Sequence, residues 1–95
     1  MSKQEINRVI RRNLARFKYC YEKQLKRNPE LSGKVKVQFT ILGSGRVGEV
    51  QALEDTMGEP AVAQCIVSRV KRWRFPKPDG GSVTVAFPFV FSPSG

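Results

Sequence analysis

Cys20 and Cys65 constrain the fold of this chain more strongly than any other pair of residues. Each lies in a segment whose apolar residues recur at the period of an α-helix, about 100° per residue. Cys20 falls roughly 90° from the centre of one apolar arc, and Cys65 falls roughly 90° from the centre of the other. Cysteines in these flanking positions predict two helices that lie side by side on one sheet and are joined laterally by a disulfide bond.

A disulfide bond would place the chain outside the reducing cytoplasm. On the chain-entropy account it would add about 4 kcal/mol to the free energy of unfolding. The alternative is that both cysteines are unpaired and pack as small hydrophobic residues, as in many cytosolic domains. We expect no metal site, because the chain has no histidine and two thiolates supply only half of a tetrahedral zinc shell.

Hydrophobic periodicity predicts two helices. The first is expected over residues 3–27 and ends before Pro29, because the residue preceding a proline avoids the helical region. The second is expected over residues 60–74, with Pro60 at its first position. The first apolar arc consists of Ile6, Ile10, Leu14, Phe17, Tyr21 and Leu25, and the second of Val62, Ile66 and Trp73.

Period-two alternation predicts three strands. Residues 34–42 alternate between apolar and polar side chains, and residues 43–45 form a glycine-rich hairpin turn. The return strand is expected over residues 46–54 and the last strand over residues 82–91.

The element order α-β-β-α-β predicts a two-layer α+β sandwich. The sheet is expected to be three-stranded and antiparallel, in the order 2-1-3, with both helices on one face. We expect one domain over residues 1–95, with the β-β-α-β core over about residues 34–91. The segment has neither an apolar span nor a signal peptide. If the domain is extracytoplasmic, as a disulfide bond would indicate, we expect it to be part of a longer chain whose export signal lies elsewhere.

The residues that usually carry out catalysis are absent or scattered. There is no histidine, the commonest general base. No serine or cysteine stands in a nucleophile motif, and residues 43–45 join two strands rather than the strand and helix of a dinucleotide site. We therefore expect no catalytic residue, no cofactor and no enzymatic activity.

The first helix carries a basic face opposite its apolar arc. With 17 Lys and Arg against 8 Asp and Glu, the net charge of +9 would attract polyanions. That face is either simply solvated or a surface for nucleic acid or another anionic polymer. No specific nucleic-acid site is expected, because the strand aromatics are assigned to the core rather than to a stacking platform. The candidate basic surface consists of Arg8, Arg12, Tyr19, Lys23 and Lys26.

The last strand lies at an edge of the predicted sheet and contains Pro88. Proline is tolerated where no N–H is required, so Pro88 is expected to face outward, and Thr84 and Ala86 with it. An extended peptide could add there as a fourth strand. The alternative is that Pro88 only protects the edge against aggregation. The candidate partner-binding residues are Ser82, Val83, Thr84, Val85, Ala86 and Phe87.

Several of these segments resemble the TonB C-terminal domain. They are residues 33–39 (GKVKVQF), 45–47 (GRV) and 70–76 (VKRWRFP), followed by a glycine pair and a valine- and phenylalanine-rich strand. Further segments resemble, more specifically, the TonB-like domains of the adventurous gliding motility group (the AgmX/PglI C-terminal type). These are residues 20–22 (CYE), 28–33 (NPELSG) and 87–89 (FPF), together with Cys65.

The resemblance implies a periplasmic domain of a longer, inner-membrane-anchored protein. TonB transmits force from an inner-membrane motor to outer-membrane receptors by pairing its last strand with a receptor segment, and that strand maps here to residues 82–87. The gliding relatives are thought to link a proton-driven motor to outer-membrane components. The resemblance thus implies a protein partner that supplies an extended peptide.

Two further alternatives remain at this point. One is TonB-type energy transduction to an outer-membrane transporter, although the two cysteines depart from TonB and fit the gliding group. The other concerns assembly: we expect a monomer, with a strand-swapped dimer as the alternative.

Overall fold

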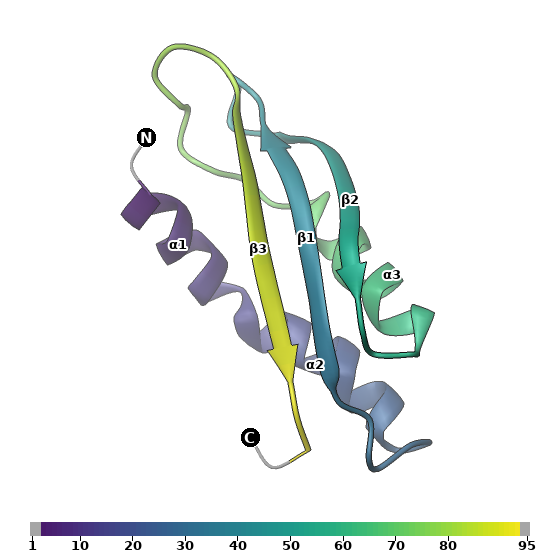
Figure 1. Cartoon of the computed structure of the whole chain (residues 1–95). Coiled ribbons are helices and arrows are strands. Elements are labelled where there is room, and N and C mark those ends of the chain that lie inside the picture. The colour runs from purple at the N-terminus through teal and green to yellow at the C-terminus, as the bar shows by residue number, and fades with distance from the viewer. Residues whose placement is uncertain (1–2, 94–95) are drawn as a thin grey trace.

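A computed structural model describes residues 3–93 of the chain as one α+β unit (Figure 1). The elements are α1 (Lys3–Arg12), α2 (Leu14–Leu25), β1 (Gly33–Ile41), β2 (Val47–Asp55), α3 (Pro60–Val70) and β3 (Val83–Phe91). All three strands begin and end within one residue of the predicted bounds, because alternation and glycine turns mark them clearly in the sequence.

The sheet has the predicted antiparallel order β2-β1-β3. Figure 1 shows the helices on one face of the sheet, with the other face open. β1 explains this two-layer arrangement, because its alternate side chains Val35, Val37, Phe39 and Ile41 are all buried. A strand with one apolar face must bury that face against another layer, and the helices supply that layer. The predicted fold class is confirmed.

The sequence predicts one continuous first helix, and this prediction was wrong. The helix is broken at Asn13 into α1 and α2. The Asn13 side chain donates to the carbonyl oxygen of Val9 at 2.8 Å, and its backbone N–H donates to Ile10 O at 3.0 Å. Asparagine competes with helical hydrogen bonding in this way, which is why it disfavours helix interiors. Of the predicted arc, Phe17 and Tyr21 are buried as expected, whereas Leu14, directly after the break, is 39% exposed; Val9, outside the arc, is also buried.

The helix α3 ends at Val70, four residues earlier than predicted. The backbone N–H groups of Arg72 and Trp73 donate three residues back, to Arg69 O and Val70 O, so the chain tightens as it leaves the helix. This turn carries the Trp73 side chain into the core, where it is 6% exposed. Trp73 is therefore a core residue of the segment after the helix, and not part of the helical arc.

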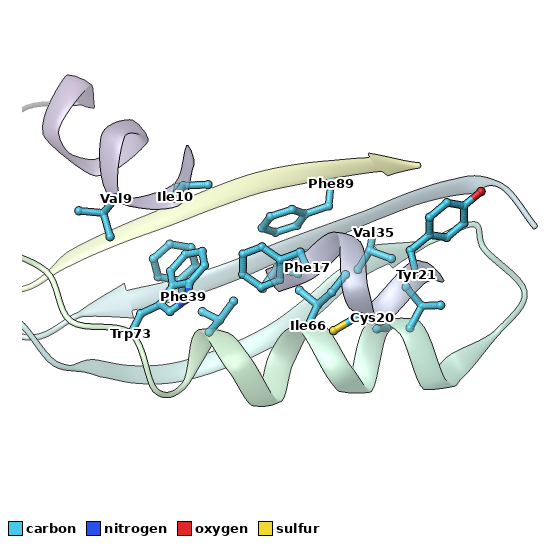
Figure 2. Close-up of a cluster of buried hydrophobic side chains, with 14 of the residues drawn as sticks. Val9, Ile10, Phe17, Cys20, Tyr21, Val35, Phe39, Ile66, Trp73 and Phe89 are labelled. Carbon is cyan, nitrogen blue, oxygen red and sulfur yellow. The ribbon is translucent and has the colours of Figure 1, made fainter. Parts of the chain in front are cut away.

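An aromatic cluster joins the sheet to the helical layer (Figure 2). The Phe17 ring on α2 lies 4.8 Å from the Trp73 ring and 4.7 Å from the Phe89 ring, measured between centroids. Phe39 on β1 contacts both Trp73 and Phe75. Aromatic pairs at such distances add about 0.5–1.5 kcal/mol each beyond the area that they bury. Phe17 thus connects α2 to β3 and to the segment after α3.

Tyr21 closes the core at the other end of α2. Its side chain is 3% exposed, its ring stacks on that of Phe91, and its hydroxyl donates to the carbonyl oxygen of Leu31. Burial raises the pKa of Tyr21 above the usual 10.0, because desolvation disfavours the phenolate. The neutral hydroxyl is therefore the form that the fold requires.

We expect Tyr21→Phe to lower the free energy of unfolding at neutral pH by about 1 kcal/mol, because the buried Leu31 carbonyl loses its donor. In the unsubstituted chain, the stability that depends on the neutral phenol is complete below pH 10.0 and is lost as the pH rises through the raised pKa. Phenylalanine cannot ionise, so the difference between the two proteins should close above that pH. Urea unfolding at a series of alkaline pH values measures this difference in the free energy of unfolding.

The matched control is Tyr19→Phe. Tyr19 is 54% exposed, so this substitution removes a phenol hydroxyl without changing the core. Any other effect of alkaline pH is common to all three proteins and cancels in the comparison. A difference between Tyr21→Phe and the unsubstituted chain that stays constant across the alkaline range would contradict the assignment.

Candidate functional site

β3 pairs with β1 in an unbroken register from Gly33↔Phe91 to Ile41↔Val83. In an antiparallel pair, hydrogen-bonded and non-hydrogen-bonded positions alternate along each strand. Pro88 lies opposite Lys36 and has no N–H to exchange, so it occupies a non-hydrogen-bonded position. The even-numbered residues of β3 therefore direct their backbone groups away from β1.

The hydrogen bonds on the far side of β1 support the same parity. Thr56 N donates to the carbonyl oxygen of Lys34 at 2.8 Å, and Lys34 N donates to Thr56 Oγ1 at 2.8 Å. Lys34 thus directs its backbone groups toward the end of β2 and away from β3. Even-numbered residues of β1 bond on the β2 side, which leaves the odd-numbered ones for β3.

β3 is an edge strand, so its outward backbone groups have no strand partner among residues 3–93. Thr84 and Ala86 each present an N–H and a C=O along this edge. Val83, Thr84, Val85, Ala86 and Phe87 lie within β3, whereas Ser82 precedes it and is not part of the strand. The chain before Val83 is still turning at Gly80 and Gly81, whose φ angles are +80° and +107°. The candidate edge therefore begins one residue later than predicted.

The two edges of the sheet differ in regularity. The pairing of β2 with β1 is shifted twice, between Lys36 and Val37 and between Phe39 and Ile41. Such irregularities twist and blunt an edge, and acidic residues such as Glu54 on β2 discourage further pairing. Only the β3 edge, of the two, carries a regular ladder that another strand could extend.

The faces of β3 are also distinct. Thr84, Ala86, Pro88 and Val90 are exposed, and Phe89 is buried among the helices. On the open face, Thr84 Oγ1 lies 3.4 Å from Thr40 Oγ1, and Lys34 forms an ion pair with Glu54 at 3.3 Å. Phe39 and Phe89 are core residues, as predicted, and so offer no stacking surface for bases.

The predicted disulfide bond between Cys20 and Cys65 is present. It joins α2 to α3 with a Cα–Cα distance of 5.7 Å and encloses a sequence separation of 45 residues. Cys20 is 1% exposed, and Cys65 is partly buried against the same core. The flank positions thus correspond to two helices in lateral contact, as the sequence indicated.

The predicted basic surface is divided by the break at Asn13. Its members Arg8, Arg12, Tyr19, Lys23 and Lys26 are all exposed, but the first two belong to α1 and the others to α2 or its C-terminal cap. The Arg69 guanidinium lies over the Tyr19 ring, 5.6 Å from its centroid. The helix beneath this surface is not continuous as predicted, and the basic surface itself stays a prediction.

Arg12 and Arg16 line one groove with Arg72 and Arg74. In the sequence, the last two stood out only as part of a family-like motif. The available signal was the i, i+4 spacing of Arg12 and Arg16, which places both side chains on one side of the helical segment.

Residues 3–93 contain neither a membrane-spanning helix nor a metal-ligating cluster. No helix in that range has the length and hydropathy to span a bilayer. Nor do three or more Cys, Asp or Glu side chains gather there in a metal-ligating group. The expectations of no metal, no cofactor and no catalytic residue stay predictions.

Comparison with known proteins gives consistent results. The sequence profile described as the Gram-negative bacterial TonB protein C-terminal matches residues 21–93. The tyrosine-protein kinase MasK of Myxococcus xanthus (strain DK1622) is 33% identical over 85 residues, which are 90% of this chain and 13% of that protein. The chain thus corresponds to a small part of this relative.

Two solved structures have a similar fold. The solution structure of the Helicobacter pylori TonB C-terminal domain aligns with a TM-score of 0.63 at 19% identity, covering 97% of this chain and 83% of that one. The Pseudomonas aeruginosa TonB C-terminal domain aligns with a TM-score of 0.56 at 27% identity, covering 73% of each chain. TonB C-terminal domains are periplasmic interaction domains of Gram-negative bacteria that bind protein partners.

We expect reduction of the disulfide bond to lower the free energy of unfolding by about 4 kcal/mol, the chain-entropy value for a loop of this length. Urea unfolding with and without reductant measures the change, and Cys20→Ser combined with Cys65→Ser serves as the control that reductant cannot affect. Equal stability of the oxidised and reduced chains would return both cysteines to the role of small core residues.

Proposed function

Since the chain belongs to the TonB C-terminal family, we propose that it is a periplasmic interaction domain that binds an extended segment of a protein partner by strand addition to β3. The observation that carries this proposal is the regular β3 edge, on which Thr84 and Ala86 direct their backbone groups away from β1. A partner strand that pairs with these groups continues the sheet without any change in the fold.

Pro88 would limit the length of the pairing. It has no N–H, so a partner strand loses one main-chain hydrogen bond at that position. Pairing would therefore be confined to Val83–Phe87, with Thr84 and Ala86 supplying the donors and acceptors. The same proline would also hinder edge-to-edge pairing of β3 with the sheet of another copy of the chain.

We extend the proposal to the longer protein from which this domain comes. The domain would be anchored to the inner membrane through its parent chain. It would couple a motor in that membrane to outer-membrane components, which would bind at the β3 edge. A role in gliding motility would follow from the resemblance of residues 20–22, 28–33 and 87–89 to the gliding motility group, and the 33% identical relative comes from Myxococcus xanthus. The domain itself would be monomeric and would have no catalytic activity, and the kinase named in that relative would reside outside the matched region.

TonB-type energy transduction to an outer-membrane transporter is the second candidate. It is supported by the two structural neighbours, which are both C-terminal domains of TonB. The candidates share strand addition at β3 and differ in the partner. Recovery of transporters, or of other envelope proteins, by crosslinking from β3 in the intact cell envelope distinguishes them.

Proline substitution tests strand addition directly. Ala86→Pro removes an outward N–H that β1 does not use, so the fold should persist, whereas the affinity for a partner segment should fall by about tenfold, the effect of one lost main-chain hydrogen bond and its steric clash. The matched control is Val90→Pro, which has the same parity but lies beyond Pro88. Heteronuclear NMR titration with the crosslinked partner's segment measures both affinity and location.

Chemical-shift changes should cluster at Val83–Phe87 in the unsubstituted chain. Perturbation confined to α1, α2 and α3, with β3 unaffected, would rule out strand addition. So would equal loss of affinity in Ala86→Pro and Val90→Pro.

A further inference from the structure

Four arginine side chains line one groove on the helical side of the molecule. Arg12 is the last residue of α1 and Arg16 lies in the first turn of α2, four residues later, and both line the groove. Arg72 and Arg74 stand on either side of Trp73, whose indole is buried and lines the same groove. With the indole turned inward, its two arginine neighbours are exposed.

The position of Arg74 is fixed by the backbone. Phe75 N donates to the carbonyl oxygen of Gly45 at 2.8 Å, and Arg74 forms an antiparallel bridge with Arg46. A Cβ on Gly45 would lie 2.2 Å from the Phe75 carbonyl oxygen, so only glycine permits this approach. The bridge places two like charges opposite each other, an arrangement that is unfavourable unless an anion neutralises it.

The groove has no internal counter-charge. Its lining consists of Val9, Arg12, Asn13, Arg16, Arg72, Trp73 and Arg74 and includes no carboxylate. Among the described residues, none of the four arginines belongs to an ion pair, in contrast to Lys18 with Glu22 and Lys34 with Glu54. Uncompensated charge of one sign in a concave site raises the local concentration of the opposite charge.

A neighbouring group is also unsatisfied. Arg69 Nε is buried and has no hydrogen-bond partner among the described residues. Arg69 is not a lining residue of the groove. Its carbonyl oxygen accepts from Arg72 N, and its guanidinium lies over the ring of Tyr19, three residues after Arg16 on α2. A buried donor without an acceptor is uncommon in a folded domain, and here it adds to the same positive field.

We propose that this groove binds an acidic segment of a protein partner, with the carboxylates held by Arg12, Arg16, Arg72 and Arg74. Guanidinium groups form bidentate bonds with carboxylates, which lysine cannot do. Two arginine pairs on separate elements provide positions for carboxylates spaced along an extended segment. The groove contains no residue of β3, so the binding is independent of strand addition.

The surroundings of the groove disfavour the other polyanions. A lipid surface would require protruding apolar side chains beside the charges, but Val9 and Trp73 are buried and the exposed Leu14 faces Val90 and Phe91 instead. Single-stranded nucleic acid is held by aromatic rings free for stacking, whereas the one ring that lines the groove, Trp73, is buried. Neither requirement applies to an acidic polypeptide.

The oxidised 95-residue chain can be titrated with a short peptide in which aspartate alternates with glycine. Its single tryptophan, Trp73, lines the groove, so intrinsic fluorescence reports binding at this site. Arg16→Gln and Arg74→Gln should each weaken binding by about tenfold, the loss expected for one charge-assisted contact. Neither should lower the melting temperature, because both relieve repulsion between like charges.

The matched control is Arg27→Gln, which removes the same charge from an exposed position after α2. It should change the affinity less than about twofold, because an exposed charge at a distance is screened by salt. An asparagine–glycine peptide should not bind. Equal weakening by Arg27→Gln would overturn the site, and tighter groove binding of inorganic phosphate, an oligonucleotide or anionic vesicles would overturn the acidic-peptide assignment.

Discussion

The rest of the structure depends on β1, the central strand, which pairs with β2 on one side and with β3 on the other and buries one face in the core. Its odd-numbered side chains Val35, Val37, Phe39 and Ile41 enter the core, which fixes the face that the helices cover. Its backbone divides by the same parity, with even-numbered residues bonded toward β2 and odd-numbered residues toward β3. One strand therefore determines both the layer arrangement and which backbone groups of β3 remain available at the edge.

The helical layer is fastened to this strand by different contacts at different points of α2. Phe17 packs on Trp73 and Phe89, Cys20 is bonded to Cys65, and Tyr21 packs on Phe91. These residues lie within two turns of one helix. Arg16 lies at the flank of this attachment, about 100° around the helix from Phe17, and lines the groove with the arginines after α3. Core packing and the basic groove thus adjoin each other on α2.

Sequence reasoning succeeded where a local pattern has one structural solution. The alternation from Lys34 onward, the glycine turns and the flank positions of Cys20 and Cys65 led to the correct strands, sheet order and disulfide bond. It failed at Asn13 and Trp73, because periodicity alone cannot show that a side chain bonds back to Val9 or that a helix tightens at its end. The second error concealed the arginine groove, because Arg72 and Arg74 reach it only from the turn that follows α3.

The disulfide bond divides the chain in a way that bears on coupling. The disulfide bond closes a loop from Cys20 to Cys65 that contains β1, β2 and the turn between them. β3 lies outside this loop. The bond therefore restrains the helices and the β1–β2 hairpin directly, and β3 is held by its pairing with β1 and by the packing of Phe89 and Phe91. A load applied along β3 passes to the disulfide-bonded unit through nine residue pairs aligned with the strand. Shear of that kind stresses the hydrogen bonds together rather than in turn, so the edge that is free to bind is also anchored along its whole length.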